Sequence, residues 1–500
     1  MDFLANLGIG IDAVLNFTNL GYCFLGTLLG TLIGVLPGLG PVATIAMLLP
    51  ITYGLPPLSA LIMLAGIYYG AQYGGSTTAI LVNLPGESSS VVTCLDGYAM
   101  ARQGRAGAAL GIAALGSFFA GTVATIIIAA AAAPLAEFAL KFGPAEYFSL
   151  MLLGLVAAVV LAQGDFFKAI AMVMLGLVLG LVGTDVNSGV ERFTFGFPEL
   201  SDGINFVVLS MGLFGIAEII ANLEQREKRE VFTQGIGSLW PGRKDLRTAF
   251  KPVVRGTLLG SVLGILPGGG AVLASFASYT LEKRLAKDPS RFGKGAIEGV
   301  AGPESANNAG AQTSFIPLLV MGLPSNAVMA LMVGAMMIHG IVPGPQVMSE
   351  RPTLFWGLIV SMWIGNVFLL LLNMPLISIW VRLLRVPYRL LYPVILVFCC
   401  VGIYSVNNSA FDVGLALFFG IVGYLFIKLA CEPAPLVLGF VLGPMMEENL
   451  RRAMLLSRGD ATVFFTRPIS FCLLLLALVL IFILAAPKVR KTRQEAFREA

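Results

Sequence analysis

Long, uninterrupted apolar runs recur from one end of the chain to the other. Examples are Ala106–Ala133, Ala145–Ala162, Ala169–Val182, Phe355–Leu372 and Ile469–Ala486. Several of them are as long as the roughly 18–20 residues with which a helix crosses a bilayer. Barrel strands instead alternate over about 10 residues, so these continuous segments indicate helices. The pattern predicts an all-α polytopic membrane protein with about 10–12 transmembrane segments.

One apolar, glycine-rich segment occurs twice. Gly26–Pro41 reads GTLLGTLIGVLPGLGP and Gly256–Ala271 reads GTLLGSVLGILPGGGA, with ten of sixteen positions identical at an offset of 230 residues. Proline removes a helix hydrogen bond, and glycine leaves the backbone free to turn. Each copy is therefore predicted to form a hairpin of two short half-helices. The predicted hairpin or gating residues are Pro37, Gly38, Gly40 and Pro85 in the first half and Pro267, Gly268, Gly270 and Pro324 in the second.

A second pair of segments extends the repeat. Tyr68–Glu87 reads YYGAQYGGSTTAILVNLPGE, and Glu304–Asn326 reads ESANNAGAQTSFIPLLVMGLPSN. Each has a polar patch, a short apolar run and then Leu-Pro, and the two prolines Pro85 and Pro324 lie 239 residues apart. Several matches in the same order predict an internal duplication, with broken helices and helical hairpins in two homologous repeats.

The distribution of basic residues divides the chain. We predict a first membrane repeat over residues 1–225, a basic cytoplasmic linker over 226–252, a second repeat over 253–487 and a basic cytoplasmic tail over 488–500. Lysine and arginine favour the cytoplasmic side of a membrane. Inverted repeats with an odd number of crossings would place the linker and the tail on opposite sides, yet both are basic. The topology therefore stays open at this stage.

The composition agrees with a membrane protein and argues against nucleic-acid binding, a disulfide framework and a metal site. Charged residues make up 12% of the chain, about half the fraction of a soluble domain. The net charge of +4 does not suggest nucleic-acid binding. The six cysteines form no CxxC pair, so we expect neither a disulfide framework nor a metal site. The single histidine, His339, is expected to pack locally near a helix end.

The two polar patches are the predicted substrate site. Interrupted helices at corresponding positions of two halves indicate a transporter's binding site. Neutral donors beside restarting helices suit a carboxylate or a similar anion, because helix amino termini offer free N–H groups. Close helix packing by small residues is the alternative. The predicted binding residues are Gly75, Ser76, Thr77, Thr78 and Asn83 in the first half and Asn307, Asn308, Gln312, Thr313, Ser314, Ser325 and Asn326 in the second.

Acidic residues near apolar segments are candidates for ion coupling. Glu87 and Glu304 each lie beside a patch and are the predicted coupling residues. An ionisable group inside a membrane is costly, so it is a functional candidate by default. Unwound backbone carbonyls could hold Na⁺ instead. The alternative for these acids, and for Asp96, Asp165, Glu298 and Asp412, is that each is solvated or paired.

Together with GPMMEENLRRAMLLSRGD near the carboxyl end, the repeated segments resemble the large membrane subunit of the bacterial tripartite tricarboxylate transporters, from about Asp12 to Pro487. The resemblance implies a multi-pass protein of the bacterial inner (cytoplasmic) membrane. It implies import of tricarboxylates or related carboxylates, such as citrate, by symport with Na⁺ or H⁺. The implied partners are a small membrane subunit and a periplasmic substrate-binding protein. The resemblance also implies that the two repeats are inverted. By analogy with other ion-coupled carboxylate carriers, a hairpin-bearing domain would move as an elevator.

An enzyme, an ATP-driven transporter, a channel and a scaffold are the other functions open to a helical membrane protein. A membrane enzyme would need an acidic metal motif or a nucleophile with a base, and the sequence shows neither. No Walker sequence indicates ATP use. We therefore expect no enzyme and no cofactor other than the coupling ion. An anion channel or a membrane scaffold subunit is the alternative function, and the particular carboxylate, the choice of Na⁺ or H⁺, and the oligomeric state stay open.

Overall fold

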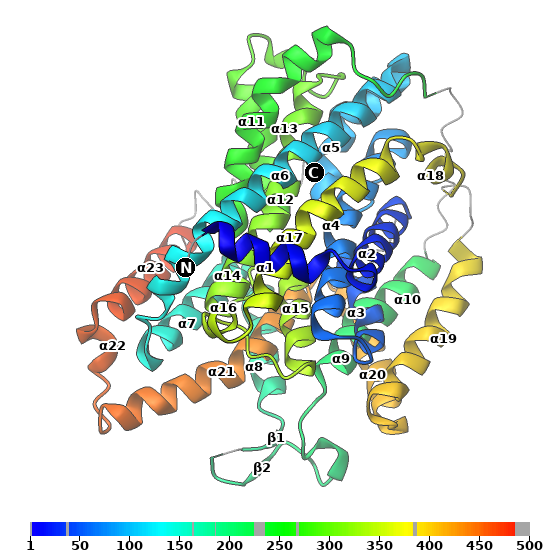
Figure 1. The fold of residues 1–500 in the computed structure, drawn as a ribbon. Helices are drawn as coiled ribbons and strands as arrows, with labels where there is room; N and C mark the ends of the chain where they lie inside the picture. Colours follow the sequence, from blue (N-terminus) through cyan, green and yellow to red (C-terminus); the bar gives the residue numbers. More distant parts are fainter. Residues whose placement is uncertain are drawn as a thin grey trace.

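The computed structural model describes residues 3–36, 40–162, 165–185, 187–224, 236–266, 270–383 and 388–485. The described chain is a helical bundle with one small β-hairpin at one end (Figure 1). Its first half contains α1 (Phe3–Val14), α2 (Phe17–Val35), α3 (Pro41–Thr52), α4 (Pro57–Val82), η1 (Ser88–Ser90), α5 (Val91–Thr93), η2 (Cys94–Tyr98), η3 (Ala101–Arg105), α6 (Ala106–Ala139), α7 (Pro144–Leu161), α8 (Phe166–Gly180), β1 (Gly183–Thr184), β2 (Glu191–Arg192), η4 (Pro198–Leu200), α9 (Phe206–Ser210), η5 (Met211–Ile216) and α10 (Ala217–Glu224).

The second half is also helical. It contains α11 (Arg243–Ile265), α12 (Gly270–Leu285), η6 (Pro289–Arg291), α13 (Glu298–Thr313), α14 (Phe315–Met321), α15 (Ala327–Ile338), α16 (Gln346–Glu350), α17 (Pro352–Asn373), α18 (Ile377–Leu383), α19 (Tyr388–Asn407), α20 (Ala410–Lys428), α21 (Ala434–Leu456), α22 (Val463–Thr466) and α23 (Pro468–Ala485). Within the described residues, five helices are long and apolar enough to cross a membrane, and six shorter apolar helices accompany them. The predicted all-α membrane fold is confirmed.

Helices α2 and α4 pack backbone against backbone. Glycines spaced four residues apart make this approach possible, since a Cβ on any of them would lie 2.3–2.4 Å from a carbonyl oxygen of α4. Small residues at this spacing are a general device for close helix packing in membranes. The residue numbers increase together in the contacting pairs of α2 and α4, so the two helices run in the same direction. The pairs are Gly26 with Met63, Gly30 with Ile67, and Gly34 with Ala71.

Helices α11 and α13 pack in the same way. A Cβ on their contacting glycines would lie 2.2–2.4 Å from carbonyl oxygens of α13. The contacting glycines of α11 follow those of α2 by 230 residues, and their partners in α13 follow the partners in α4 by 239 residues. The two halves thus share one packing arrangement at the spacing of the sequence repeat. The pairs are Gly256 with Gly302, Gly260 with Ala306, and Gly264 with Gly310.

The predicted hairpin is present in the second half. A Cβ on Gly310 would meet Ala271 near the start of α12, whereas one on Gly302 would meet Glu282 near its end. Helix α12 therefore runs back along α11 and α13. The expectation of short half-helices is wrong, because α11 spans 23 residues and begins at Arg243, inside the segment predicted as a linker.

The glycines that flank the two breaks have defined places. Gly40 is the N-cap of α3, and Gly270 begins α12 with a φ of +40°. The other four predicted break residues, Pro37, Gly38, Pro267 and Gly268, lie outside the described residues.

The α2–α4 pair and the α11–α13 pair meet with their helices running in opposite directions. The rings of Tyr68 on α4 and Phe315 on α14 lie 6.5 Å apart, while farther along α4 Ser76 contacts Glu304 on α13. Because one set of numbers rises as the other falls, α4 is antiparallel to the α13–α14 segment. Inverted repeats have this relation. The duplication itself stays a prediction.

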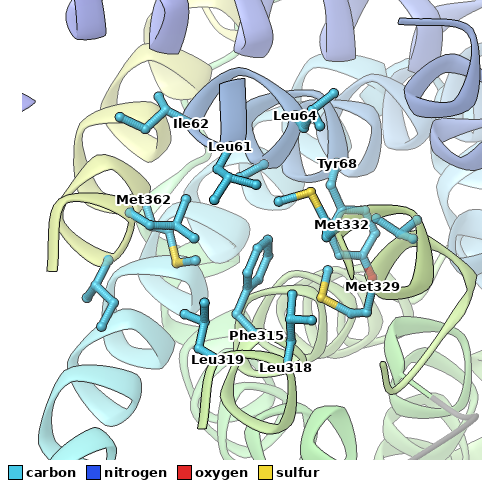
Figure 2. Packing of buried hydrophobic residues seen from close by; sticks show 14 of the residues in the cluster. Leu61, Ile62, Leu64, Tyr68, Phe315, Leu318, Leu319, Met329, Met332 and Met362 are labelled. Atoms are coloured by element: carbon cyan, nitrogen blue, oxygen red, sulfur yellow. The ribbon is translucent and has the colours of Figure 1, made fainter. Parts of the chain in front are cut away.

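A large apolar cluster packs beside this crossing (Figure 2). Phe315 of α14 points toward Leu61 of α4, and Met329 and Met332 of α15 lie close to Tyr68. These side chains are at most 3% exposed. The cluster ties α4, α14 and α15 together and closes one side of the polar centre described below.

An ion pair holds the α11–α12 hairpin. Arg255 donates two hydrogen bonds to the carboxylate of Glu282, which is 2% exposed. The change Glu282→Gln should lower the free energy of unfolding by about 1–2 kcal/mol, a value reduced from that of a fully buried pair because Arg255 is one-third exposed. Glu448→Gln, in the exposed pair with Arg452, is the control and should change it little. Thermal unfolding in detergent measures both, and equal midpoints would contradict the role of the Arg255 pair.

The β1–β2 hairpin projects from one end of the bundle and is fastened to α21 (Figure 1). Asp185 accepts hydrogen bonds from the backbone N–H of Asn187 and from Ser188, and Arg451 of α21 donates to it at 2.9 Å. These hydrogen bonds, and then the charge of Arg451, lower the pKa of Asp185 from 3.8 to about 2.

The lowered pKa gives a pH-dependent prediction. The stabilisation from ionised Asp185 is complete above its ordinary pKa and is lost as the pH falls through about 2. At neutral pH, Asp185→Asn should therefore speed hydrogen exchange in residues 187–205, and the difference from the natural chain should vanish below pH 2. The exposed Asp202→Asn in the same loop is the control. Equal exchange rates for Asp185→Asn and the natural chain at pH 7 would refute the prediction.

Candidate polar site between the halves

The polar patches of the two halves meet at Glu304. Its side chain lies on α13 and is fully buried. Ser76 Oγ of α4 lies 2.5 Å from Glu304 Oε2, Thr93 Oγ1 of α5 donates to Oε1, and Asn307 Nδ2 donates to Oε2 at 3.3 Å. The carboxyl group is thus surrounded by neutral donors from both halves. No lysine or arginine among the described residues forms an ion pair with it.

Helix α6 forms a third wall through Ser117. Asn308 Nδ2 lies 2.8 Å from Ser117 Oγ, 3.0 Å from the carbonyl oxygen of Glu304 and 2.8 Å from Asn307 Oδ1. Ser117 Oγ in turn donates to the carbonyl oxygen of Glu304 at 3.2 Å. This network fixes the part of α13 that carries Glu304 against α6.

A small cavity adjoins these side chains. It has a volume of about 10 Å³, room for about one water molecule. This space cannot hold a molecule much larger than water. Asn373 Oδ1 is buried beside the cavity and has no hydrogen-bond partner in the described part of the chain. The polar residues of the lining are Tyr73, Ser76, Thr77, Ser117 and Asn373.

The first predicted patch lies inside a helix. Gly75, Ser76, Thr77 and Thr78 occupy the interior of α4, so the prediction that they flank a restarting helix is wrong. The packing of α2 explains this, because Thr78 Oγ1 donates to the carbonyl oxygen of Val35 and the glycines contact α2 instead of breaking α4. Asn83 ends α4 as a C-cap in the left-handed conformation, with a φ of 56°.

The second predicted patch is divided between two places. Asn307, Asn308, Gln312 and Thr313 lie inside α13, again contrary to the prediction of a helix start. Ser314 joins α13 to α14. The expectation holds for Asn326, which caps α15 by accepting a hydrogen bond from the backbone N–H of Met329 at 2.9 Å.

Not every patch residue faces the centre. Thr313 bonds the backbone of its own helix, and Ser325 donates to the carbonyl oxygen of Ser314 at 3.4 Å. Gln312 Oε1 is buried and unpartnered among the described residues. The structure therefore brings Ser76, Thr77, Asn307 and Asn308 together and leaves the other patch residues around them.

The loops after α4 and α14 follow one plan. A left-handed residue stands two positions before each predicted gating proline: Asn83 before Pro85, and Gly322 before Pro324. A capping residue stands two positions after each proline. In the first half this cap is Glu87, whose carboxylate accepts the backbone N–H of Ser89 at 2.9 Å. Glu87 thus has a local structural role, and its side chain also contacts the Ser89 hydroxyl.

The other acids have partners, as the alternative interpretation expected. Asp96 accepts the backbone N–H groups of Gly295 and Ala296 and the hydroxyl of Tyr279, which joins the halves. Asp165 caps α8, Glu298 pairs with Arg291, and Asp412 accepts from Asn407. His339 follows the last residue of α15, at a helix end as expected.

Some residues of interest were not singled out from the sequence. Ser117 and Asn373 are isolated polar residues in apolar helices, and that isolation is the signal that could have found them. Glu218 is an acid within the apolar span Phe206–Glu224 and has no ion pair among the described residues. No group of three or more His, Cys, Asp or Glu side chains in the described chain could hold a metal ion.

Comparison with known proteins decides the family. The model of the tripartite tricarboxylate transporter TctA family matches residues 20–438. The chain belongs to the TctA family. The match includes both glycine-packed helix pairs, Ser76 and Glu304, so the buried centre lies within the family region.

Two relatives of this TctA-family chain come from Agrobacterium vitis. One is described as "Uncharacterized 52.8 kDa protein in TAR-I ttuC' 3'region" and is 59% identical over 499 residues, covering 100% of this chain and 99% of that protein. The other, "Uncharacterized protein in TAR-II ttuC' 3'region", is 60% identical over 240 residues, covering 48% of this chain and 99% of that protein. No solved structure matches the chain.

Proposed function

We propose that this TctA-family chain is the permease subunit of a secondary transporter in the bacterial inner membrane that imports tricarboxylates or related carboxylates. Uptake would be driven by a Na⁺ or H⁺ gradient. A periplasmic binding protein would deliver the substrate, and a small membrane subunit would complete the assembly. The observation that carries the proposal is the buried contact of Ser76 with Glu304, which joins the two halves inside an apolar helical bundle.

The arrangement suits alternating access to a central site. Hydroxyl and amide groups from α4, α6 and α17 line one small cavity, and such groups hydrogen-bond carboxylates. The cavity holds about one water, so the halves would separate along α4 and α13 to admit substrate. The contact of Ser76 with Glu304 is made by side chains, so it can break without the loss of a backbone hydrogen bond.

Concentrative uptake of labelled citrate into proteoliposomes tests the proposal. The vesicles would contain both membrane subunits, with and without the binding protein, under an imposed Na⁺ or H⁺ gradient. Accumulation that requires the binding protein and one gradient is expected. Accumulation of other carboxylates alone would change only the substrate. If no carboxylate accumulates, the anion channel or scaffold alternative would replace this proposal.

A further inference from the structure

We infer that the coupling ion is a proton, which binds Glu304 Oε2 in the closed state and reaches it from the small cavity through Ser76. The inference rests on the proposed transport function and deepens it by choosing H⁺ over Na⁺. The atoms around Glu304 offer too few hydrogens to satisfy every close contact unless Glu304 itself carries one.

The Ser76 hydroxyl has one proton and two acceptors within reach. Its Oγ lies 3.0 Å from the carbonyl oxygen of Gln72 and 2.5 Å from Glu304 Oε2. A hydroxyl donates a single hydrogen bond. If Ser76 donates to Gln72, one turn earlier in α4, the contact with Glu304 needs a hydrogen on Oε2. A protonated Glu304 then donates to Ser76, and both contacts are satisfied.

The remaining partners of Glu304 also fit a neutral acid. Thr93 donates to Oε1, and Asn307 Nδ2 donates to Oε2 at 3.3 Å, so both oxygens of the protonated group keep an acceptor role. Glu304 is fully buried and pairs with no lysine or arginine in the part of the chain that the structure describes, so its ionised form would cost several kcal/mol. The hydroxyl oxygens of Ser76 and Thr93 each contact an oxygen of Glu304 at hydrogen-bonding range, whereas a Na⁺ ion bound to Glu304 and either hydroxyl would stand between the two oxygens.

The charged and titratable surroundings agree. The titratable groups nearest to Glu304 are Tyr73 on α4, Glu87 before η1 and Cys94 at the start of η2, and none is cationic. Helix α6 presents Ser117. Arg255 and Glu282 lie at another face of α13, near Gly302, and pair with each other.

A path for the proton is present. Ser76 lines the cavity that has room for about one water and also contacts Glu304. A hydronium ion there can pass a proton to Ser76 Oγ while the hydroxyl proton of Ser76 moves to Glu304 Oε2. One O–H bond of the hydronium ion breaks and leaves water, one O–H bond forms on Glu304, and the charge of the proton neutralises the carboxylate. Opening of the halves would expose the group and release the proton on the other side.

Proton influx and gradient-driven uptake test the inference in proteoliposomes with both membrane subunits, the binding protein and a pH dye inside. In Na⁺-free buffer, citrate should acidify the lumen of vesicles with the natural chain. Glu304→Gln keeps the size of the neutral acid and a donor for Ser76. It should lose at least about 90% of pH-driven accumulation, and the accompanying acidification, while retaining citrate counterflow. Asp412→Asn, at a buried acid outside this site, should behave as the natural chain.

Three outcomes would overturn the inference. Accumulation under a Na⁺ gradient without acidification would support the transport function but exclude the proton as the coupling ion. A Glu304→Gln variant that still accumulates citrate in response to the pH gradient would also exclude Glu304 as the proton-binding residue. Absence of any carboxylate uptake by the natural chain would remove the proposed function itself. If Glu304→Gln does not fold, the rate of acidification is compared between the natural chain and Ser76→Ala. We expect slower acidification in Ser76→Ala, and an unchanged rate would exclude the proton path through the cavity.

Discussion

Replacement of Gly30 by valine is expected to abolish most folded protein. A Cβ at this position would lie 2.4 Å from the carbonyl oxygen of Ile67 and 2.9 Å from the Cα of Gly70. These neighbours are backbone atoms of a buried helix, which cannot yield as a side-chain end can. Forcing even one extra group into a packed contact costs about 1–3 kcal/mol, and valine adds three carbons here, so we expect a loss at or above the upper end of that range.

Gly21 is the matched control for Gly30. It lies in the same helix α2, and nothing lies within 4 Å of the position of its Cβ. The change Gly21→Val should therefore leave folded yield and thermal unfolding nearly unchanged. Size-exclusion chromatography of a fluorescent fusion measures both variants. Equal yields of the two would show that α2 and α4 do not pack as closely as described.

Asn308→Ala is expected to lower carboxylate uptake by about tenfold or more with little loss of assembled protein. The change removes the hydrogen bonds of Nδ2 to Ser117 and to Asn307, on which the alignment of α13 with α6 depends. A typical hydrogen bond contributes about 0.5–1.5 kcal/mol to stability. Ser117 and Asn307 each lose one here but keep another to Glu304, so the fold is retained.

Asn449→Ala separates this effect from a general helix effect. Asn449 Nδ2 also bonds a carbonyl oxygen four residues earlier, that of Met445, but it lies in α21 away from the polar centre. Uptake and detergent-stable yield would be measured for both variants. If both lose uptake equally, or if Asn308→Ala transports normally, Asn308 has no part in transport.

The sequence predicts the contents of the polar centre better than its local geometry. Repeated glycines, polar patches and lone acids all follow from composition against an apolar background, so Ser76, Asn307, Asn308 and Glu304 are found in advance. The patches are predicted to lie beside restarting helices, although Gly, Ser, Thr and Asn are only weak helix formers and can lie inside a helix that packing supports. Gly26, Gly30 and Gly34 of α2 pack against α4, and this packing outweighs the weak helix propensity. Helix α4 therefore continues through Gly74 and Gly75.

Other features depend on contacts between distant segments and cannot be read from one stretch. The pairing of Ser76 with Glu304 spans 228 residues, and that of Ser117 with Asn308 spans 191. Neither follows from spacing along a helix. The separate roles of Glu87 and Glu304 are also invisible in the sequence, because both stand beside a patch, yet one caps a short helix and the other lies buried between the halves.

The central claim is that the polar centre is closed at rest and opens between the halves during transport. Thr77 lines the cavity and is 3% exposed, so Thr77→Cys tests it directly. Its reaction with a maleimide would be followed by mass spectrometry in proteoliposomes, with the exposed Thr280→Cys as a positive control. We predict slow labelling at rest and much faster labelling when the binding protein, citrate and a gradient are supplied together. Equally fast labelling in both conditions, or none in either, would contradict the account.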